Sequence, residues 1–304
     1  MVKSASMSPA TQNKRHQGKE SALLGAHFSI AGGLHKALFT AQEYGCTALL
    51  IFTKNASTWK ERRLSTREIE QFQATRKQSG VRSICAHAAY LINLASPDRC
   101  KYEKSIMALE QELIRSSQLG IPHVIIHPGA HMGMGEEKGL RRIAEGIDTV
   151  FDHVPETTCR VLLETTAGQG SNLGYSFEHL AGIADRVNAK DRIGFCFDTC
   201  HVFAAGYDLR TKMAYGQTMK AFDTTVGLER LHVIHLNDAK KGLGSRTDRH
   251  AHIGEGGMGV ETFRFIMNDS WFKAIPKILE TPKETGPVDY DRLNLERLRS
   301  LIQH

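Results

Sequence analysis

Nine of the histidine, aspartate and glutamate side chains in this sequence are candidate ligands for transition metals, and six of the nine directly follow short apolar segments. The six are His87, His127, Glu164, Asp198, His235 and Glu280. Three more are expected in loops beyond strands: His201, three residues after Asp198 in the segment DTCH, and the pair Asp248 and His250 in the segment DRH. Because alternate residues of an extended segment face the same side, Asp248 and His250 can bind one ion together. The pattern predicts a metal centre that can activate water.

The number and chemistry of these groups indicate more than one metal ion. A zinc ion usually takes about three or four protein ligands, so five histidines and four carboxylates are sufficient for two or three ions. Mixed imidazole and carboxylate ligands suit Zn²⁺, Mn²⁺ or Fe²⁺ better than Mg²⁺ or Ca²⁺, and zinc is the first expectation. His27 also ends an apolar segment but lacks a partner set, so we expect it to support the site or to pack. Cys196 and Cys200 flank Asp198, and we expect them to be small buried residues rather than ligands.

The apolar segments themselves predict a parallel barrel. Eight such segments occur, and their first residues lie 23 to 44 positions apart: Leu24–His27, Thr47–Phe52, Val81–Ala86, His123–Ile126, Arg160–Leu163, Ile193–Phe197, Leu231–Ile234 and Ile275–Leu279. Stretches of helical character lie between most of them: Gly33–Tyr44, Thr66–Ser79, Asp98–Leu119, Glu136–Phe151, Phe177–Val187 and Thr218–Leu228. Apolar strands that alternate with amphipathic helices favour an α/β fold of the TIM (β/α)₈ type, an eight-stranded parallel barrel. In such barrels reactive groups gather at the carboxyl ends of the strands, which is where the candidate ligands stand.

Composition sets the broader frame. The chain has 304 residues, of which 41% are hydrophobic and 24% charged, which suits one large globular domain and excludes a disordered or collagen-like chain. No apolar run approaches the length of a membrane span, and the N-terminus lacks the apolar middle of a signal peptide. Six cysteines without a CxxC pair favour a reducing compartment, and we expect a cytoplasmic protein.

The N-terminus differs from the rest of the chain. Residues 1–20 carry four basic residues against one acidic residue, within a formal net charge of +6 for the whole chain. We expect residues 1–20 to form a disordered basic tail and residues 21–304 to form a single catalytic barrel. The tail is interpreted either as an arm that touches nucleic acid or as a start-site extension before Met7.

Longer motifs carry a family resemblance. In order along the chain they are GAHFSIAGGL, FTKN, HAAYLINL, HPGAH, ETTAGQGSNLG, DTCHVFAAGYDLRT, HLNDAK, GSRTDRHAHIGEGGMG and ILET. From about Leu24 to Thr281 they strongly resemble the endonuclease IV family of apurinic/apyrimidinic (AP) endonucleases of base-excision repair. The resemblance implies a TIM barrel with three zinc ions. It also implies hydrolysis of double-stranded DNA on the 5′ side of an abasic site, which leaves a 3′-hydroxyl and a 5′-deoxyribose phosphate. We further expect removal of 3′-blocking groups and a monomeric protein.

The resemblance also assigns the candidate ligands to ions. One ion would be held by His87, His127 and Glu164, a second by Glu164, Asp198, His235 and Glu280, and a third by His201, Asp248 and His250. Glu164 would bridge two ions and act in catalysis, and one of the sites could take Mn²⁺ or Fe²⁺. Tyr90 and Leu91 match residues that probe the DNA helix at the lesion. Asn55 and Arg249 are expected to contact DNA, together with other basic residues of the same loops, including Lys54.

Two motifs depart from the family pattern. The usual KNxRxW reads KNASTW here, so Ser57 stands where the family has an arginine that enters the DNA. The usual HDSY reads HAAY, which keeps His87 and Tyr90 but loses two polar groups. Ser57 predicts weaker compensation for the bases lost from the stack and weaker DNA affinity.

Two other functions can be compared with this interpretation. A sugar isomerase or epimerase on the same barrel would need only the set Glu164, Asp198, His235 and Glu280. A DNA-binding protein without catalysis would need none of the nine ligands. The remaining five candidates therefore favour the nuclease.

Overall fold

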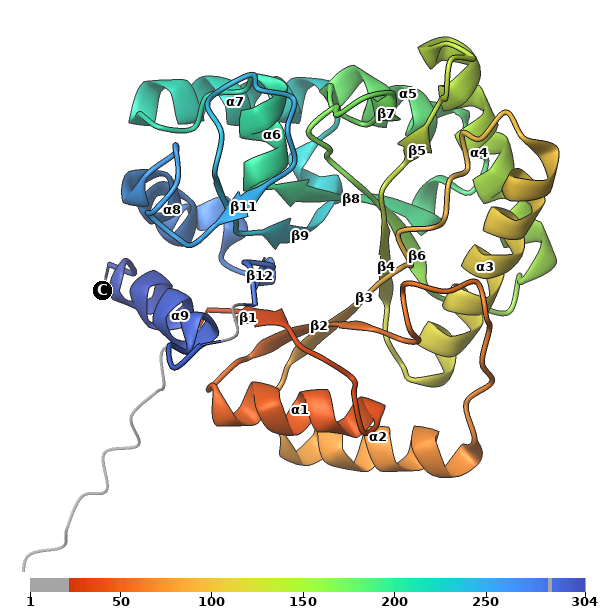
Figure 1. Cartoon of the computed structure of the whole chain (residues 1–304), viewed down its shortest axis with the longest axis horizontal. Helices are drawn as coiled ribbons and strands as arrows, with labels where there is room; N and C mark the ends of the chain where they lie inside the picture. Colours follow the sequence, from red (N-terminus) through yellow and green to blue (C-terminus); the bar gives the residue numbers. More distant parts are fainter. Residues whose placement is uncertain (1–21, 284–285, 304) are drawn as a thin grey trace, which may run out of the picture.

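Eight parallel strands close into a barrel within residues 22–283 and 286–303, which the computed structural model describes (Figure 1). Around the barrel the strand order is β1, β12, β9, β8, β6, β4, β3, β2. The strands are β1 (Leu24–His27), β2 (Ala48–Phe52), β3 (Ser83–His87), β4 (His123–Ile126), β6 (Arg160–Glu164), β8 (Ile193–Asp198), β9 (Leu231–His235) and β12 (Lys277–Leu279). The TIM-barrel prediction is confirmed, while the predicted tail of residues 1–20 lies outside the described residues.

Four of the strands extend one residue further than the sequence pattern predicts. They end at His87, Glu164, Asp198 and His235 instead of at the apolar residue before each. These polar residues still pair with the neighbouring strand, as Asp198 does with His235. Hydrophobicity marks the buried part of a strand, whereas the hydrogen-bonded ladder continues to the polar end. The candidate ligands therefore sit on rigid strand ends.

Helices surround the barrel (Figure 1). Their bounds are α1 (Leu34–Glu43), α2 (Thr66–Gln78), α3 (Arg99–Gln118), α4 (Glu136–His153), α5 (Phe177–Arg186), α6 (Thr199–Ala205), α7 (Lys212–Thr225), α8 (Val260–Asn268) and α9 (Tyr290–Ser300). The sequence pattern predicted a helix at Thr218–Leu228, whereas α7 begins at Lys212 and ends at Thr225. Helices α6, α8 and α9 were not predicted. Helix α6 is too short for a periodic pattern, and α9 buries only Asn294, Leu295 and Leu298. Among the described residues, none of the helices has the length and hydropathy that a membrane span requires.

Two apolar layers hold the structure together. The larger lies between strands and helices, and it includes Leu49, Ile84 and Phe195. The smaller layer fills the barrel interior with Ala48, Leu50, Cys85, Ile125, Leu162, Cys196, Val233 and Ile278. Because alternate strand residues contribute to the two layers, both faces of the sheet are buried, as in other parallel barrels.

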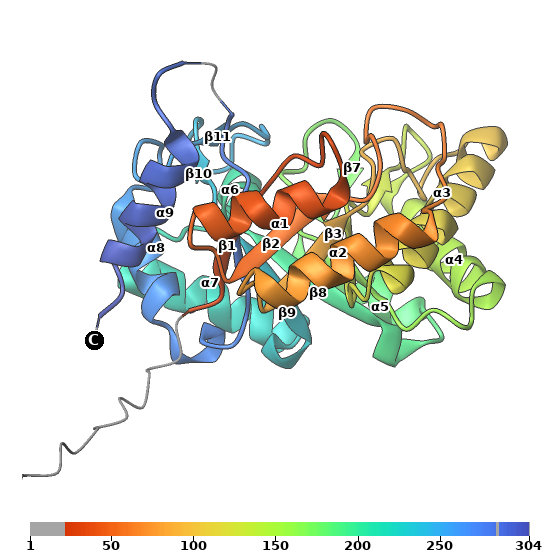
Figure 2. The same cartoon turned by 90° about the horizontal axis from the view of Figure 1, so that it is seen from below.

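Two short antiparallel pairs stand at one end of the barrel. Strand β5 (Gly129–Ala130) pairs with β7 (Asn172–Leu173), and β10 (Asp238–Ala239) pairs with β11 (His250–Ala251). Figure 2 shows β7, β10 and β11 at the same end of the molecule. Since β10 follows β9 by two residues, this is the end at which the strands present their carboxyl termini. The two pairs therefore lie at the end of the barrel that carries the candidate ligands.

Candidate metal centre

All nine candidate ligands meet at the carboxyl ends of the barrel strands. Their donor atoms form three groups, within each of which the atoms lie no more than 4.8 Å apart, and two further groups of this kind include the buried Cys196 or Cys200. The three groups are His87 with His127 and Glu164; Glu164 with Asp198, His235 and Glu280; and His201 with Asp248 and His250. These are the same three sets that the sequence resemblance implies. Residues separated by up to 193 positions, from His87 to Glu280, thus converge on one site.

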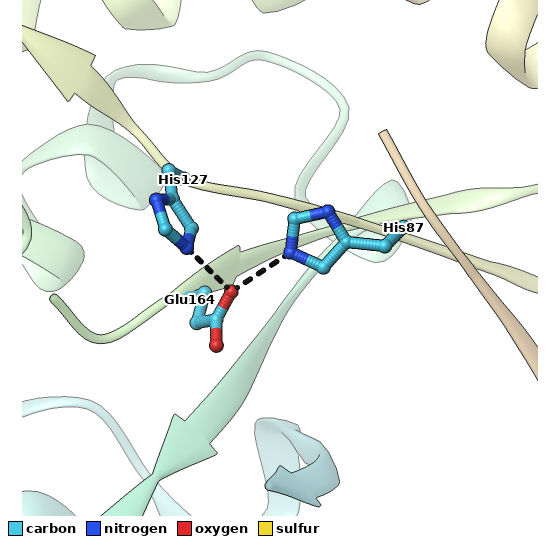
Figure 3. A group of neighbouring side chains, drawn as sticks. All are labelled: His87, His127 and Glu164. Atoms are coloured by element: carbon cyan, nitrogen blue, oxygen red, sulfur yellow. Dashed lines mark hydrogen bonds and ion pairs between the residues drawn. The ribbon is translucent and has the colours of Figure 1, made fainter. Parts of the chain in front are cut away.

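The first group is centred on one oxygen of Glu164. Oε2 of Glu164 lies 3.1 Å from Nε2 of His87 and 3.1 Å from Nε2 of His127 (Figure 3). Two ligand atoms bound tetrahedrally to zinc at about 2.0–2.1 Å are separated by roughly 3.3 Å. The three side chains therefore fit a shared ion with little movement.

The second group surrounds His235. Its Nδ1 lies 2.8 Å from Oε1 of Glu164 and 2.9 Å from Oε2 of Glu280, while Oδ2 of Asp198 is 3.9 Å away. Glu164, Asp198 and His235 are completely buried. Three carboxylates around one buried imidazole are costly unless cations or protons compensate their charge. The donor set fits a divalent ion.

The third group lies between α6 and the β10–β11 hairpin. Oδ1 of Asp248 is 3.2 Å from Nε2 of His201 and 3.4 Å from Nε2 of His250. The sequence pattern suggested that His201 lies in a loop, but it lies in α6. The reason is local: Asp198 is the N-cap, and its Oδ1 accepts the backbone N–H of His201 at 2.9 Å. One aspartate thus starts the helix and places His201 in its first turn.

Backbone carbonyls fix the ring orientation of three of the histidines. Nδ1 of His87 donates to the carbonyl of Ala88 at 2.7 Å, and Nδ1 of His201 donates to that of Thr165 at 2.8 Å. Nδ1 of His250 donates to the carbonyl of Glu280 at 2.9 Å. A carbonyl only accepts, so each Nδ1 carries the hydrogen, and in the neutral ring Nε2 keeps its lone pair. This arrangement is typical of metal-binding histidines.

Several buried nitrogens are left without a hydrogen-bond partner. Among the described residues, Nε2 of His201, His235 and His250 is buried and makes no hydrogen bond. Buried polar atoms are nearly always paired, so unpaired atoms call for an explanation. The Nε2 atoms of His201 and His250 both face Asp248, and a cation bound among these three residues would explain why they make no hydrogen bond.

Charges at the site shift the pKa values of its groups in opposite directions. Burial lowers the pKa of His201, but Asp198, Asp248 and Glu164 outweigh burial and raise it to about 10. Burial likewise lowers the pKa of His250, and Asp248 and Asp198 raise it to about 9. The pKa of Glu164 is held well below its ordinary value because His235 and His127 outweigh burial. The carboxylate of Glu164 therefore stays ionised, and cations or protons must balance its charge.

Comparison with known proteins identifies the family. The family model described as "Xylose isomerase-like TIM barrel" matches residues 38–301. A protein of Citrifermentans bemidjiense named "Probable endonuclease 4" is 48% identical over 282 residues, 92% of this chain and 99% of that protein. The chain belongs to the endonuclease IV family. The crystal structure of endonuclease IV from Thermus thermophilus is 38% identical and has a TM-score of 0.81, covering 91% of this chain and 98% of that chain.

A more distant likeness concerns the fold alone. The structure of a D-tagatose 3-epimerase-like protein is 18% identical with a TM-score of 0.68, and covers 91% of this chain and 95% of that chain. The barrel is thus shared beyond the endonuclease IV family. The family membership predicted from the sequence motifs is confirmed by the relatives, not by the barrel.

The sequence interpretation missed residues that hold the ligands of this endonuclease IV family member in place. The amide of Asn237 contacts Asp198 and the backbone of Glu280, and Oγ1 of Thr165 accepts the backbone N–H of Asp198 at 2.9 Å. Asn237 stands two residues after His235, so alternation along an extended segment could have placed it on the same face. His27 takes the supporting role that the sequence suggested, with Nδ1 2.8 Å from Oε1 of Glu280.

The predicted DNA-contacting residues lie on loops near the metal centre. Tyr90 is 63% exposed, and its ring centroid lies 5.4 Å from that of Phe52 and 5.6 Å from that of His87. Leu91 follows it and is half-buried, while Asn55 and Arg249 are exposed. A cavity of about 630 Å³ is lined by Asn55, Ser57, Tyr90 and Glu280, among others, but not by Arg249.

Lys54 does not have the exposed position expected of a DNA contact. It is 4% exposed, and its Nζ donates to the carbonyl of Thr58 at 2.5 Å within its own loop. The buried Arg115 of α3 also holds this loop. Its guanidinium donates hydrogen bonds to Oγ1 of Thr53 and Oε2 of Glu61. The loop that carries Asn55 and Ser57 is therefore anchored by buried charged groups.

Proposed function

We propose that this protein is a metal-dependent AP endonuclease that hydrolyses double-stranded DNA on the 5′ side of an abasic site. The products would be a 3′-hydroxyl and a 5′-deoxyribose phosphate. Membership of the endonuclease IV family supports a DNA-cleaving hydrolase of DNA repair. The observation that carries the proposal is the position of Glu164, whose carboxylate belongs to two of the three ligand groups.

We propose zinc as the resident metal, with three ions per chain and Mn²⁺ or Fe²⁺ as an alternative at one site. The donor set of imidazoles and carboxylates suits these metals. The buried Nε2 atoms of His201 and His250 make no hydrogen bond and lie near Oδ1 of Asp248, so these three residues would hold one such ion. Zinc held there would supply Lewis acidity, which promotes deprotonation of water and neutralises charge on the phosphate.

The chain's own residues would hold and orient the reacting groups. Glu164 remains ionised because the neighbouring histidines lower its pKa. An ionised Glu164 can bridge two cations and can accept a proton at a carboxylate oxygen. The ring orientation of His87, fixed by the carbonyl of Ala88, keeps Nε2 directed at the same carboxylate.

Selectivity for abasic DNA would begin at the exposed rim. An abasic nucleotide has lost its stacking and pairing, so turning it out of the helix costs less than turning out an intact nucleotide. We propose that Tyr90 and Leu91 enter the helix at that position and that Asn55 and Arg249 contact the strand. Phosphate contacts of this kind position the duplex and make binding depend on salt.

A sugar epimerase is the main competing function, because the same fold occurs in an epimerase-like protein. The group Glu164, Asp198, His235 and Glu280 would be sufficient for a single-metal sugar enzyme. The other two groups would then have no purpose. Their close assembly favours the nuclease.

Removal and return of zinc test the proposal directly. A 5′-labelled duplex with one abasic site is incubated with native, chelator-treated and zinc-reconstituted protein, with an intact duplex as control. We expect incision of the abasic duplex alone, loss after chelation and recovery with zinc. Extension of the product by a DNA polymerase would show the 3′-hydroxyl, and a duplex with a 3′-phosphate tests removal of blocking groups. Persistent incision after complete demetallation would refute the metal mechanism.

We further propose that the protein acts as a monomer in the cytoplasm. All six cysteines are free in the structure, which suits a reducing compartment. Size-exclusion chromatography with light scattering, at the concentration used for incision, tests the monomer.

A further inference from the structure

We propose that Asn237 is the positioning residue of the central ligand group, because its buried amide links Asp198 on one side of His235 to Glu280 on the other. This inference rests on the proposed function, since it assigns Asn237 a role toward the ion that the central group would hold. Asn237 is completely buried and belongs to none of the three ligand groups.

The order of the strands explains why this position can reach both neighbours. Strand β9 lies between β8 and β12. His235 is level with Asp198 on β8 and with Ile278 on β12. Two residues further along, Asn237 follows His235 and Glu280 follows Ile278. Asn237 therefore stands between the two outer strands, just beyond the imidazole that the central carboxylates surround.

The two ends of the amide make different hydrogen bonds. The backbone N–H of Glu280 donates to Oδ1 of Asn237 at 2.8 Å, and Nδ2 of Asn237 donates to Oδ2 of Asp198 at 2.6 Å. A backbone N–H only donates, so the amide oxygen must face Glu280 and the amide nitrogen must face Asp198. An aspartate could not donate to Asp198, and a leucine of similar size could make neither bond.

The backbone of Asn237 is fixed as well. Its N–H donates to Oγ1 of Thr199 at 2.9 Å, and Oγ1 of Thr199 donates to its carbonyl at 2.7 Å. Both backbone groups and both ends of the amide are thus paired. A fully paired, buried amide has one orientation, which is what a positioning residue requires.

The consequence is a fixed carboxylate at Asp198. Its Oδ1 accepts the N–H of His201 at the start of α6, and its Oδ2 accepts the amide of Asn237. The same Oδ2 lies 3.9 Å from Nδ1 of His235 and 3.9 Å from Nε2 of His250. Asn237 therefore directs the oxygen that faces both the central and the third ligand group. Loss of such a partner typically weakens metal binding about 10- to 100-fold.

The test compares Asn237→Leu and Asn237→Ala with the wild-type protein. Zinc affinity and stoichiometry are measured by competition with a chelating dye, and Co²⁺-loaded protein is examined by visible absorption. We expect both variants to bind zinc about 10- to 100-fold more weakly and to show an altered Co²⁺ spectrum. For the abasic duplex, kcat should fall while KM changes little, because no DNA-contacting loop is altered.

Asn188→Leu is the matched control. Its amide also donates to an aspartate, Oδ2 of Asp148 at 2.9 Å, but at an exposed position. Zinc affinity should be unchanged in this variant. Far-UV circular dichroism with chelator present checks the fold, and the alanine variant covers the case in which leucine is too bulky.

The outcomes separate this inference from the proposed function. If the wild-type protein binds no zinc, the proposed function fails. If the wild-type protein binds zinc and a folded Asn237 variant binds it with the same affinity and the same Co²⁺ spectrum, the positioning role is wrong. Weaker zinc binding together with a kcat effect, in either folded variant, supports it.

Discussion

Oε1 of Glu164 lies 2.8 Å from Nδ1 of His235, and both side chains are completely buried. The other oxygen of the same carboxylate lies 3.1 Å from His87 and from His127. Glu164 therefore joins two ligand groups whose members come from separate strands. A change at this one residue should disturb both groups, which makes it the most informative position for mutation.

Glu164→Gln should lower turnover on an abasic duplex by about 100-fold or more, with little loss of fold. The amide keeps the volume of the side chain but removes the charge that two cations would share. Loss of a residue that only hydrogen-bonds to a metal ligand already lowers activity about 10- to 100-fold, so loss of a shared ligand should cost at least as much. Single-turnover incision with zinc present measures the effect. The melting temperature of the chelator-treated variant should stay within about 4 °C of the wild type, which corresponds to roughly 1 kcal/mol.

Glu110→Gln provides the matched control for this prediction. Glu110 also contacts a histidine, with Oε1 2.6 Å from Nδ1 of His153, but that pair lies outside the metal centre. Turnover should be normal in this variant. Near-normal incision by the Glu164→Gln variant would rule out the bridging role.

Tyr90→Ala should weaken binding of an abasic duplex about tenfold while kcat on saturating substrate changes little. Tyr90 is 63% exposed, and its ring packs against that of Phe52, which fixes its position at the surface. Stacking of a base or base pair on an aromatic ring contributes about 1–3 kcal/mol. Fluorescence anisotropy with an uncleavable abasic duplex measures the affinity. Trp271→Ala, an equally exposed aromatic residue before the amino end of β12, should leave it unchanged.

The barrel and the ligand groups were predictable because their signals are local. Each of the eight strands contains a short apolar segment, and the polar ends of parallel strands must meet at one rim. The short spacing in DTCH also indicates its structure in retrospect, since Asp198 caps a helix and places His201 one turn along. Motif resemblance then assigned residues to groups that the strand order brings together.

The supporting contacts were not predictable in the same way, because they join distant segments. Nothing local to Asn237 shows that its neighbours are Asp198 and the backbone of Glu280, which depends on the strand order. Lys54 has the sequence context of an exposed basic residue but is buried in its own loop, next to Glu61. Such networks follow from packing and can be seen only once the fold is known.

His123 should make the protein less stable in acid. It starts β4, and its ring stacks on that of His232 with centroids 5.0 Å apart, at the amino ends of the strands. Burial lowers the pKa of His123 to about 4, with His232 and Arg160 acting in the same direction. The unfolded chain therefore binds a proton below about pH 6.5 that the folded protein excludes until about pH 4. The free energy of unfolding therefore decreases as the pH drops from about 6.5 to about 4, and His123 accounts for about 3 kcal/mol of this decrease.

The variant His123→Gln tests the assignment by removing the titration. The free energy of unfolding is measured by urea unfolding of chelator-treated protein at several pH values. Between pH 6.5 and pH 4 it should decrease less in the His123→Gln variant than in the wild type. His153→Gln, at an exposed position, should keep the wild-type decline. Parallel curves for the wild type and the His123→Gln variant would contradict the pKa shift as the cause.

Ser57→Arg should strengthen binding to abasic DNA. Ser57 is exposed and borders the cavity of about 630 Å³ that also includes Asn55 and Tyr90. Its backbone N–H donates to Oδ1 of Asn55 at 2.9 Å, which fixes the turn of the loop at this position. An arginine side chain at position 57 would therefore project from a defined backbone. One added surface contact to a phosphate is worth about 1 kcal/mol, or about fivefold in affinity. The slope of log K against log salt should steepen by about 0.9.

Ser57→Gln separates charge from length at this position, since glutamine fills similar space without a positive charge. The affinity of the arginine variant should fall more steeply with salt than that of the glutamine variant, while kcat stays the same in both because neither touches the ligand groups. Equal salt slopes would mean that residue 57 does not approach a phosphate. In that case Tyr90 and Leu91 would enter the helix without help from the Asn55 loop, and the serine at this position would not explain a weaker affinity.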